Sequence, residues 1–424
     1  MDEQDTESDL GDVAPIRHAT FGSVFAVGEF RALWLAQVLS VIGDQLARVA
    51  LTLLVYDRTR SALLAAITFA ASVVPPFVGG VALAGLADRL PRRRVMITCD
   101  VIRAALVAVM VIPGIPLAAL VALLFVVTMI ATPFSSARAA VYADILAGDR
   151  YVVGNAVTLT TYQLAQVLGF AAGGAVVEIF HTRTSLLADA ATFAVSALIV
   201  RTWVKARPAP RAPQAAKAPS QLADLLEGIR LVFARPALRT PMLLGWLAAF
   251  YNAPEGVAAP LGRSLGSGNT AIGLILAVTA LGASVGAIAF SRLVRPPARL
   301  RLMHPLAIAS CAVLILFALQ PGLPLALLIL FCCGLFDCYQ VAASSVFVME
   351  TPAAHRSQAF GLAQAGMSLG QGAAMVLAGA AAQRFTPETV IAAAGALGAI
   401  TAVMIAVSGI TRQRRAPLAG DVPG

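Results

Sequence analysis

Charged residues are scarce in this chain, and lysine is almost missing. Only 12% of the 424 residues are charged, whereas 59% are hydrophobic, and the two lysines are Lys205 and Lys217. A soluble domain carries about 25% charged residues, so this chain cannot cover a water-facing surface with charge. The composition therefore excludes an ordinary soluble protein and indicates one that lies in a lipid bilayer.

The sequence also lacks the common signatures of enzymes that hydrolyse ATP or bind zinc. It contains no Gly-x-x-x-x-Gly-Lys-Ser/Thr segment, and its four histidines are scattered without the spacing of metal ligands. The five cysteines all fall within apolar runs, where they serve as small packing residues. We expect no enzymatic activity, no cofactor and no metal site.

Long apolar runs are what the chain has in abundance. A run of about 20 apolar residues is long enough to cross a bilayer as a helix. Twelve such runs occur, so we expect an all-α integral membrane protein with twelve transmembrane helices. They span residues 30–56, 61–87, 95–113, 115–142, 154–180, 184–204, 238–261, 270–291, 302–320, 323–349, 357–383 and 388–410.

Basic residues are distributed unevenly among the loops between these runs. If both termini are cytoplasmic, one set of alternate loops holds residues 92–94, all arginine, and the basic stretch 201–239. The opposite loops hold only Arg58, Arg60, Arg183, Arg263 and Arg384. This asymmetry is the positive-inside pattern, so we expect both termini to be cytoplasmic. The Ala- and Arg-rich composition suggests a bacterial protein, so we expect the inner membrane. Because the basic residues lie in loops on one side of the membrane, we expect no nucleic-acid partner.

A proline-rich basic stretch divides the runs into two groups of six, which predicts two six-helix bundles. The first twelve residues contain six acidic residues and read as a disordered tail. We therefore expect an acidic cytoplasmic tail and leading segment at 1–29, an N-terminal bundle at 30–204, a cytoplasmic linker at 205–237, a C-terminal bundle at 238–411 and a cytoplasmic tail at 412–424.

The two groups of runs also match each other locally at an offset of 206 residues. At this offset Gly80 matches Gly286, and Pro91 matches Pro297. Arg89 matches Arg295 in the same way. The halves therefore have the character of a duplication, as in many transporters.

The loop after the second run carries a recognisable motif, Gly85-Leu-Ala-Asp-Arg-Leu-Pro-Arg-Arg-Arg94. It resembles the signature loop of the major facilitator superfamily, Gly-x-x-x-Asp-Arg/Lys-x-Gly-Arg/Lys-Arg/Lys. Asp88, Arg89, Arg92 and Arg93 fit the pattern, whereas its two glycine positions are Ala84 and Pro91. By this resemblance, Asp88 closes a cytoplasmic gate by pairing with basic groups and with the N-terminus of a helix in the other half.

Three further segments resemble the branch of that superfamily that contains enterobactin and macrolide exporters. They are FRALWLAQVLSVIGDQLARVALTLLVYDRTRSA, ARAAVYADIL and LLEGIRLVFARPALR. Proton-coupled exporters of the superfamily often carry Gly-Pro-x-x-Gly-Gly in the fifth span. Here Gly169, Gly173 and Gly174 match and Phe170 replaces the proline. Close packing of helices is an equally good interpretation of these glycines.

The first apolar run carries two opposite charges near its middle. Asp44 and Arg48 are four residues apart, so they lie on one helical face, about 6 Å from each other. A charge at the bilayer centre costs roughly 2.5–3.5 kcal/mol on insertion scales, so it indicates function by default. We expect the pair to face a water-filled cavity, with Asp44 taking up and releasing a proton. A static pair that holds helices together is the alternative.

Other ionisable residues lie within the apolar runs as well. We expect Asp100 and Arg103 near the cytoplasmic surface, where they contact the Asp88 loop, and Arg138 as a partner of Asp88 or Asp144. Asp337 lies near mid-membrane without a basic neighbour in sequence, which makes it a candidate for protonation or for binding a cationic group. Asp189 and Glu255 lie in the outer halves of their runs, where solvation by water is the alternative. Polar side chains are further candidates for a cavity wall: Gln37, Gln45, Tyr162, Gln163, Gln166, Tyr251, Asn252, Tyr339, Gln340, Gln364 and Gln371.

These observations predict a monomeric secondary transporter. We expect it to export small amphipathic molecules such as drugs, antibiotics or siderophores in exchange for protons, by alternating access of one pathway between two halves. Its partners would be the substrate, protons and the lipid bilayer. Two alternatives stay open: uptake or facilitated diffusion of a metabolite, and a membrane receptor or scaffold that does not transport.

Overall fold

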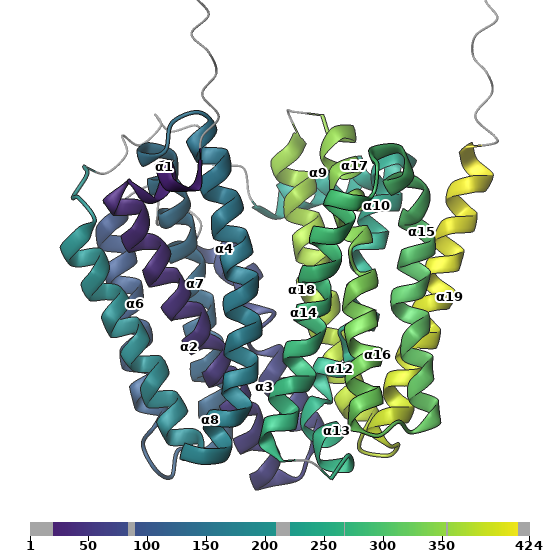
Figure 1. Cartoon of the computed structure of the whole chain (residues 1–424), viewed down its shortest axis with the longest axis horizontal. Coiled ribbons are helices and arrows are strands. Elements are labelled where there is room, and N and C mark those ends of the chain that lie inside the picture. The colour runs from purple at the N-terminus through teal and green to yellow at the C-terminus, as the bar shows by residue number, and fades with distance from the viewer. Residues whose placement is uncertain (1–19, 84–89, 209–220, 267, 353–354, 414–424) are drawn as a thin grey trace, which may run out of the picture.

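The computed structural model describes residues 20–83, 90–208, 221–266, 268–352 and 355–413 (Figure 1). Within these residues the structure is helical, and no strand occurs. The N-terminal half contains α1 (Phe21–Phe25), α2 (Gly28–Thr59), α3 (Ala62–Ala70), α4 (Pro75–Leu83), α6 (Arg92–Met110), α7 (Leu117–Ile145) and α8 (Asp149–Trp203).

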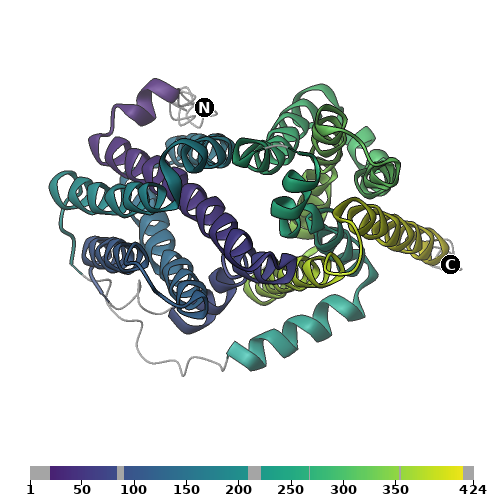
Figure 2. The same cartoon turned by 90° about the horizontal axis from the view of Figure 1, so that it is seen from below.

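The C-terminal half begins with a short helix that runs along the outside of the molecule (Figure 2). This helix, α9 (Gln221–Ala234), packs on α10 and α18. The remaining elements are α10 (Pro236–Trp246), α11 (Ala248–Tyr251), α12 (Ala253–Gly256), α13 (Ala258–Ser264), α14 (Asn269–Leu293), α15 (Pro296–Ala312), the 3₁₀ helix η1 (Val313–Leu319), α16 (Leu323–Phe336), α17 (Tyr339–Glu350), α18 (Arg356–Ala381) and α19 (Pro387–Gln413).

Eight segments of the described chain are long and apolar enough to cross a membrane. They are Gly28–Thr59, Ala62–Gly80, Leu117–Ile145, Asp149–Trp203, Asn269–Leu293, Pro297–Leu319, Leu323–Glu350 and Pro387–Ser408. The helix α6 falls outside this set, which is in keeping with its three leading arginines and the two charges within it.

Three of the expected spans have an unexpected form. The runs 154–180 and 184–204 belong to α8, whose direction changes at His181, a residue with φ of 67° and ψ of 166°. The run 238–261 is not one continuous helix but is divided among α10, α11, α12 and α13. Pro254 lacks a backbone N–H, which prevents a regular helical hydrogen bond there.

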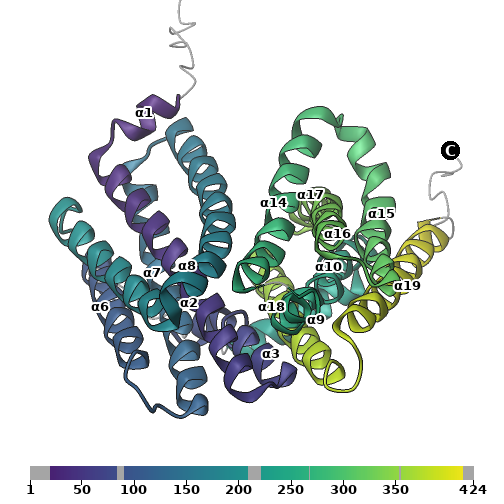
Figure 3. The same ribbon diagram turned by 60° about the horizontal axis from the view of Figure 1, so that its bottom comes forward.

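The helices gather into two groups that follow the order of the chain. Figure 3 shows α1 to α8 on one side and α10 to α19 on the other. The largest apolar cluster crosses between the groups, since it contains Phe69 and Phe170 of the first and Leu247 and Val257 of the second. Apolar packing therefore holds the two groups together over part of their contact.

Contacts between the two groups concentrate at one end of the molecule. The helix α8 packs on α14, and α3 packs on α18. The end that holds α3 and α13 lies opposite to α1 and to the C-terminal end of α19 (Figure 1). We call it the closed end.

Candidate functional site

A cavity of about 810 Å³ lies between the two groups of helices. Side chains of α2, α6, α7 and α8 line one wall, and side chains of α11, α12, α14 and α18 together with Asp337 line the other. Of the polar candidates from the sequence, Gln45, Tyr339 and Gln340 do not reach the cavity wall, whereas the other eight do. Seven charged residues line the cavity: Asp44, Arg48, Arg103, Arg138, Asp189, Glu255 and Asp337.

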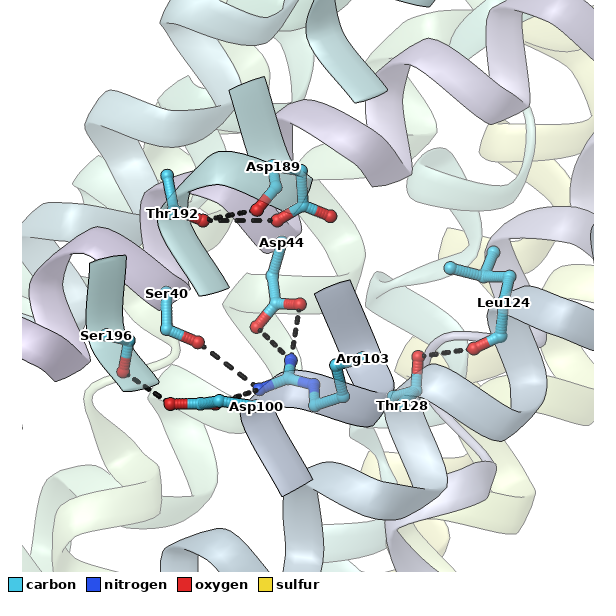
Figure 4. A network of polar contacts seen from close by, with 9 residues as sticks. All are labelled: Ser40, Asp44, Asp100, Arg103, Leu124, Thr128, Asp189, Thr192 and Ser196. Carbon is cyan, nitrogen blue, oxygen red and sulfur yellow. Dashed lines mark hydrogen bonds and ion pairs between the residues drawn. The ribbon is translucent and has the colours of Figure 1, made fainter. Parts of the chain in front are cut away.

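Arg103 and Asp44 form an ion pair in the cavity wall (Figure 4). Nη2 of Arg103 donates hydrogen bonds to Oδ1 of Asp44 at 2.7 Å and to Oδ2 at 2.9 Å. The side chain of Arg103 is 2% exposed, whereas that of Asp44 is 32% exposed. The pair thus joins α6 to α2, and it leaves the carboxylate of Asp44 accessible from the cavity.

Asp100 is a second carboxyl group beside the same guanidinium. Its Oδ1 lies 3.8 Å from Nη1 of Arg103, and its Oδ2 accepts a hydrogen bond from Oγ of Ser196 at 2.5 Å. Arg103 also donates to Oγ of Ser40 at 3.3 Å. Its guanidinium carbon lies 3.9 Å from the centroid of the Phe193 ring, a cation–π contact. Arg103 is therefore held on several sides by α2, α6 and α8.

Asp189 supplies a third carboxyl group, from the second part of α8. It is 1% exposed, and Oγ1 of Thr192 donates to its backbone oxygen at 2.7 Å and to its Oδ1 at 3.5 Å. A methyl group at Gly43 would come within 2.4 Å of Oδ1 of Asp189, so only glycine leaves room for this carboxyl beside α2. In Figure 4, Asp44 lies between Asp189 and Arg103. Arg103 thus forms ion pairs with two of these carboxyl groups and lies within electrostatic reach of the third.

This network corrects two expectations. The partner of Asp44 is Arg103 of another helix and not Arg48, because a long arginine on α6 reaches across to α2. Asp100 and Arg103 are buried in the bundle within the Asp44 network, whereas they were expected near the cytoplasmic surface; the Asp88 loop that they were expected to contact lies outside the described residues. Asp189 was a pathway candidate with solvation by water as the alternative, and its exposure of 1% argues against that alternative.

Arg48 extends instead toward the apolar cluster that joins the two halves. Its guanidinium carbon lies 5.6 Å from the ring centroid of Phe69 and 5.9 Å from that of Phe170. Its Nε is buried without a hydrogen-bond partner in the described part of the chain. The charged group within electrostatic reach of Arg48 on the opposite wall is Glu255, whose carboxyl is half-buried.

Asp337 lies at the break between α16 and α17 on the opposite wall. Oη of Tyr251 donates a hydrogen bond to its Oδ1 at 2.5 Å, and Nε2 of Gln340 donates to Oη of Tyr251 at 2.9 Å. No basic side chain of the described residues lies within 4.0 Å of this carboxylate. Among the described residues, Asp337 thus lacks a basic neighbour in space as it does in sequence.

The expected gate residues are only partly described. Asp88 and Arg89 lie outside the described residues. Arg92 forms an ion pair with Asp144 and donates to the backbone oxygen of Ala140 at 3.1 Å, which ties α6 to α7. Arg93 donates to the backbone oxygen of Arg201 at the end of α8. These contacts all lie within the N-terminal half.

Arg138 was expected to pair with Asp88 or Asp144. Asp144 pairs with Arg92 instead, because Arg138 points into the cavity and lies 5.9 Å from the ring centroid of Phe134. Arg138 is also within electrostatic reach of Asp100.

The three glycines of α8 pack against two different helices. A methyl group at Gly169 would come within 2.8 Å of Gln45, and one at Gly173 within 3.1 Å of Val49. Both of these neighbours belong to α2. A methyl group at Gly174 would come within 2.9 Å of the backbone of Gly273 in α14. Gly169 and Gly173 thus allow close packing inside the first half, and Gly174 allows it between the halves.

Polar contacts across the closed end were missed in the sequence. Arg263 donates from Nη2 to Oδ1 of Asp57 at 2.9 Å and to Oδ2 at 3.1 Å. The backbone N–H of Asn269 donates to Oε2 of Glu178 at 2.5 Å, and Gln383 donates to Ser61 at 2.7 Å. The 206-residue offset between the halves could have drawn attention to one of these contacts, because Asp57 and Arg263 are 206 residues apart.

The sequence matches the model of the Major Facilitator Superfamily over residues 33–351 and 256–422. Relatives include the multidrug efflux pump Tap of Mycolicibacterium fortuitum, which is 26% identical over 326 residues, 73% of this chain and 78% of Tap. The enterobactin exporter EntS of Escherichia coli O81 (strain ED1a) is 27% identical over 379 residues, 86% of this chain and 88% of EntS.

Solved transporter structures share the same fold. A POT family transporter in complex with 5-aminolevulinic acid superposes with a TM-score of 0.72 at 11% identity, covering 93% of this chain and 98% of that one. A bacterial homologue of the lysosomal transporter Spinster, in an inward-facing and unoccupied conformation, has a TM-score of 0.63 at 16% identity, covering 92% and 96%. Since the family model covers most of the chain, this protein is a multi-pass membrane protein that belongs to the major facilitator superfamily.

Proposed function

We propose that this protein is a proton-driven exporter of small amphipathic molecules in a bacterial inner membrane. The observation that carries the proposal is the ion pair between Arg103 and Asp44, which is exposed to the cavity on one side and backed by two more carboxyl groups. The relatives named above include a multidrug efflux pump and an enterobactin exporter, which favours export over uptake.

The charge balance of this network suits it to hold a proton. Arg103 can satisfy one carboxylate through two hydrogen bonds, as it does with Asp44. Asp100 and Asp189 are almost fully buried, and an unpaired buried carboxylate is costly. A proton on one of the three carboxyls therefore leaves the guanidinium paired and removes a charge that would otherwise be uncompensated.

Proton uptake at Asp44 would weaken its contact with Arg103 and release α2 from α6. Arg103 would then turn toward Asp100 or Asp189, which lie in the same network. Because α2 also packs on α8 and touches α13 of the other half, a shift of α2 is one route from the proton site to the contact between the halves. We assign Asp44, Arg103, Asp100 and Asp189 to the proton pathway and Arg48 and Glu255 to the substrate pathway.

The full topology belongs to the same proposal. Twelve spans form two six-helix bundles over 30–204 and 238–411, joined by the linker 205–237, with both termini cytoplasmic. The closed end then faces outward and the cavity is loaded from the cytoplasm. Transport requires the contacts at the closed end to break and the opposite end to close, for which Asp88 is the proposed latch, with Arg92 and Arg93 anchoring its loop.

Uptake of substrate into inside-out proteoliposomes tests the proposal. A cationic dye (rhodamine 6G), an uncharged antibiotic (chloramphenicol) and an anionic dye (fluorescein) are offered with and without an imposed proton gradient. We expect gradient-dependent accumulation of at least one probe by the wild type and its loss in Asp44→Asn. The control is Glu388→Gln, the same type of change at a carboxyl that accepts a hydrogen bond from Ser264 outside the cavity.

The outcomes separate the alternatives. Accumulation by the wild type that survives an uncoupler indicates facilitated diffusion and contradicts proton antiport. Binding without flux of any probe indicates a receptor or scaffold. Normal coupling in Asp44→Asn means that the Asp44–Arg103 pair is structural.

A further inference from the structure

The charges of the cavity are divided between its two walls. The N-terminal wall carries all three arginines, namely Arg48, Arg103 and Arg138. The C-terminal wall carries two acidic residues, Asp337 and Glu255, and no basic one. A ligand in the cavity therefore meets a wall with excess negative charge on one side only.

Asp337 is the carboxylate on that wall that is best prepared for a ligand. Tyr251, which is 4% exposed, fixes Oδ1 through its hydroxyl group, and Gln340 fixes that hydroxyl in turn. Oδ2 has no hydrogen-bond partner among the described residues, and the side chain is half-buried at the cavity wall. One oxygen is thus oriented by the protein while the other remains available.

A second polar group across the cavity also lacks a partner. Gln37 lines the cavity from α2 and is 3% exposed. Its Oε1 is buried without a hydrogen-bond partner in the described chain, and an unsatisfied buried acceptor is costly. A rotation of the Gln37 side chain that exposes this oxygen to the cavity would let a ligand that donates a hydrogen bond satisfy it.

We propose that the ligand of this cavity is an amphipathic organic ammonium ion, whose charged nitrogen binds Asp337 beside Tyr251 and which donates a second hydrogen bond to Gln37. The apolar side chains of the cavity, such as Val107, Leu124 and Met367, accept the hydrophobic body of the molecule. This inference rests on the proposed function only in taking the cavity as the substrate site. It requires neither proton coupling nor a direction of transport.

The test compares two probes that differ in charge and have similar shapes. Binding of 1-naphthylmethylammonium and of 1-naphthylmethanol to the purified full chain in detergent is measured by titration calorimetry. We expect the wild type to bind the ammonium at least about tenfold more tightly, the size of effect that one charge-assisted hydrogen bond produces. Equal affinities for the two probes would overturn the proposal.

Variants test whether the preference for the ammonium probe over the alcohol depends on the carboxyl group of Asp337. Asp337→Asn should remove it, and Asp337→Glu should keep most of it because the charge remains. Glu388→Gln should leave it unchanged. If Asp337→Asn does not yield folded protein, the wild-type preference and the Asp337→Glu variant still decide the matter. A preference that persists in folded Asp337→Asn assigns the cation to another group and contradicts the proposal.

Two further outcomes distinguish related possibilities. Competitive displacement of the ammonium by sodium, but not by potassium at equal ionic strength, would mean that the site binds an inorganic cation, which overturns the proposal. An Asp337-dependent preference together with absent proton-driven flux would support this inference while the proposed function fails. Proton-driven flux of chloramphenicol that is unaffected by Asp337→Asn, with no preference for the ammonium probe, would mean that the proposed function holds while this inference fails.

Discussion

Asp57 and Arg263 occupy the same position in the two halves of the chain and bind each other across the closed end. They are 206 residues apart and lie 2.9 Å from each other at Oδ1 and Nη2, and 206 is the offset at which the loops of the halves match. When two repeats are related by an axis along the membrane normal, equivalent residues close to that axis meet. If the halves are so related, the ion pair lies at their axis; in either case it joins the halves at the closed end.

Exchanging the two charges of this pair tests its role at the closed end. Each side chain is about one-third exposed or more, so we expect the pair to contribute about 0.2–1 kcal/mol. Arg263→Asp should raise the labelling rate of a cysteine placed at Tyr56, up to about fivefold. The double variant Asp57→Arg/Arg263→Asp should restore the wild-type rate. Equal labelling in all three proteins would show that the apolar packing alone closes this end.

The sequence predicted the positions of the helices better than it predicted which side chains contact each other in the site. Apolar runs report burial in lipid directly, so α2, α7, α14 and α19 were located to within a few residues. The pairing of Asp44 was predicted wrongly, because the i to i+4 rule describes an isolated helix whereas Arg103 arrives from a neighbouring one. Which side chain crosses between helices depends on their packing and is not encoded in local spacing.

Removing Arg103 should destabilise the protein more than removing it together with its partner. Arg103→Gln leaves Asp44 and Asp100 without their ion-pair partner, and breaking a buried pair in this way costs about 3 kcal/mol. The double variant Arg103→Gln/Asp44→Asn leaves fewer unpaired charges. We expect its midpoint of thermal unfolding in detergent to lie above that of Arg103→Gln. A lower midpoint for the double variant would mean that the two residues stabilise the bundle independently.

Gly174 should be sensitive to a single methyl group because it sets the distance between α8 and α14. A Cβ atom there lies 2.5 Å from the backbone oxygen of Asn269 and 2.9 Å from Gly273, and backbone cannot move aside as a flexible side chain can. Gly174→Ala should therefore separate the halves at the closed end and increase labelling of a cysteine at Tyr56. The control is Gly361→Ala, where the new methyl group meets nothing within 4 Å. Similar labelling of the two variants would contradict a role of Gly174 in closure.

Gly43 offers a way to disturb Asp189 without changing any charge. A methyl group at Gly43 would lie 2.3 Å from Oγ1 of Thr192 and 2.4 Å from Oδ1 of Asp189. Both atoms must move, and overpacking of this kind costs about 1–3 kcal/mol. If Asp189 belongs to the proton pathway, Gly43→Ala should reduce proton-driven flux while binding of the probe is retained.

Gly370→Ala is the matched control for that experiment, because its methyl group would only touch Cβ of Ala249 at 3.5 Å, an ordinary contact. Comparable loss of flux in the two variants would indicate a general intolerance of larger residues at helix glycines. Loss in Gly43→Ala alone, with an unchanged affinity for the probe, would place the effect at the carboxyl group rather than at the cavity. Since the charge of every residue is preserved, such a result would show that the position of Asp189 beside Asp44, and not only its ionisation, is needed for coupling.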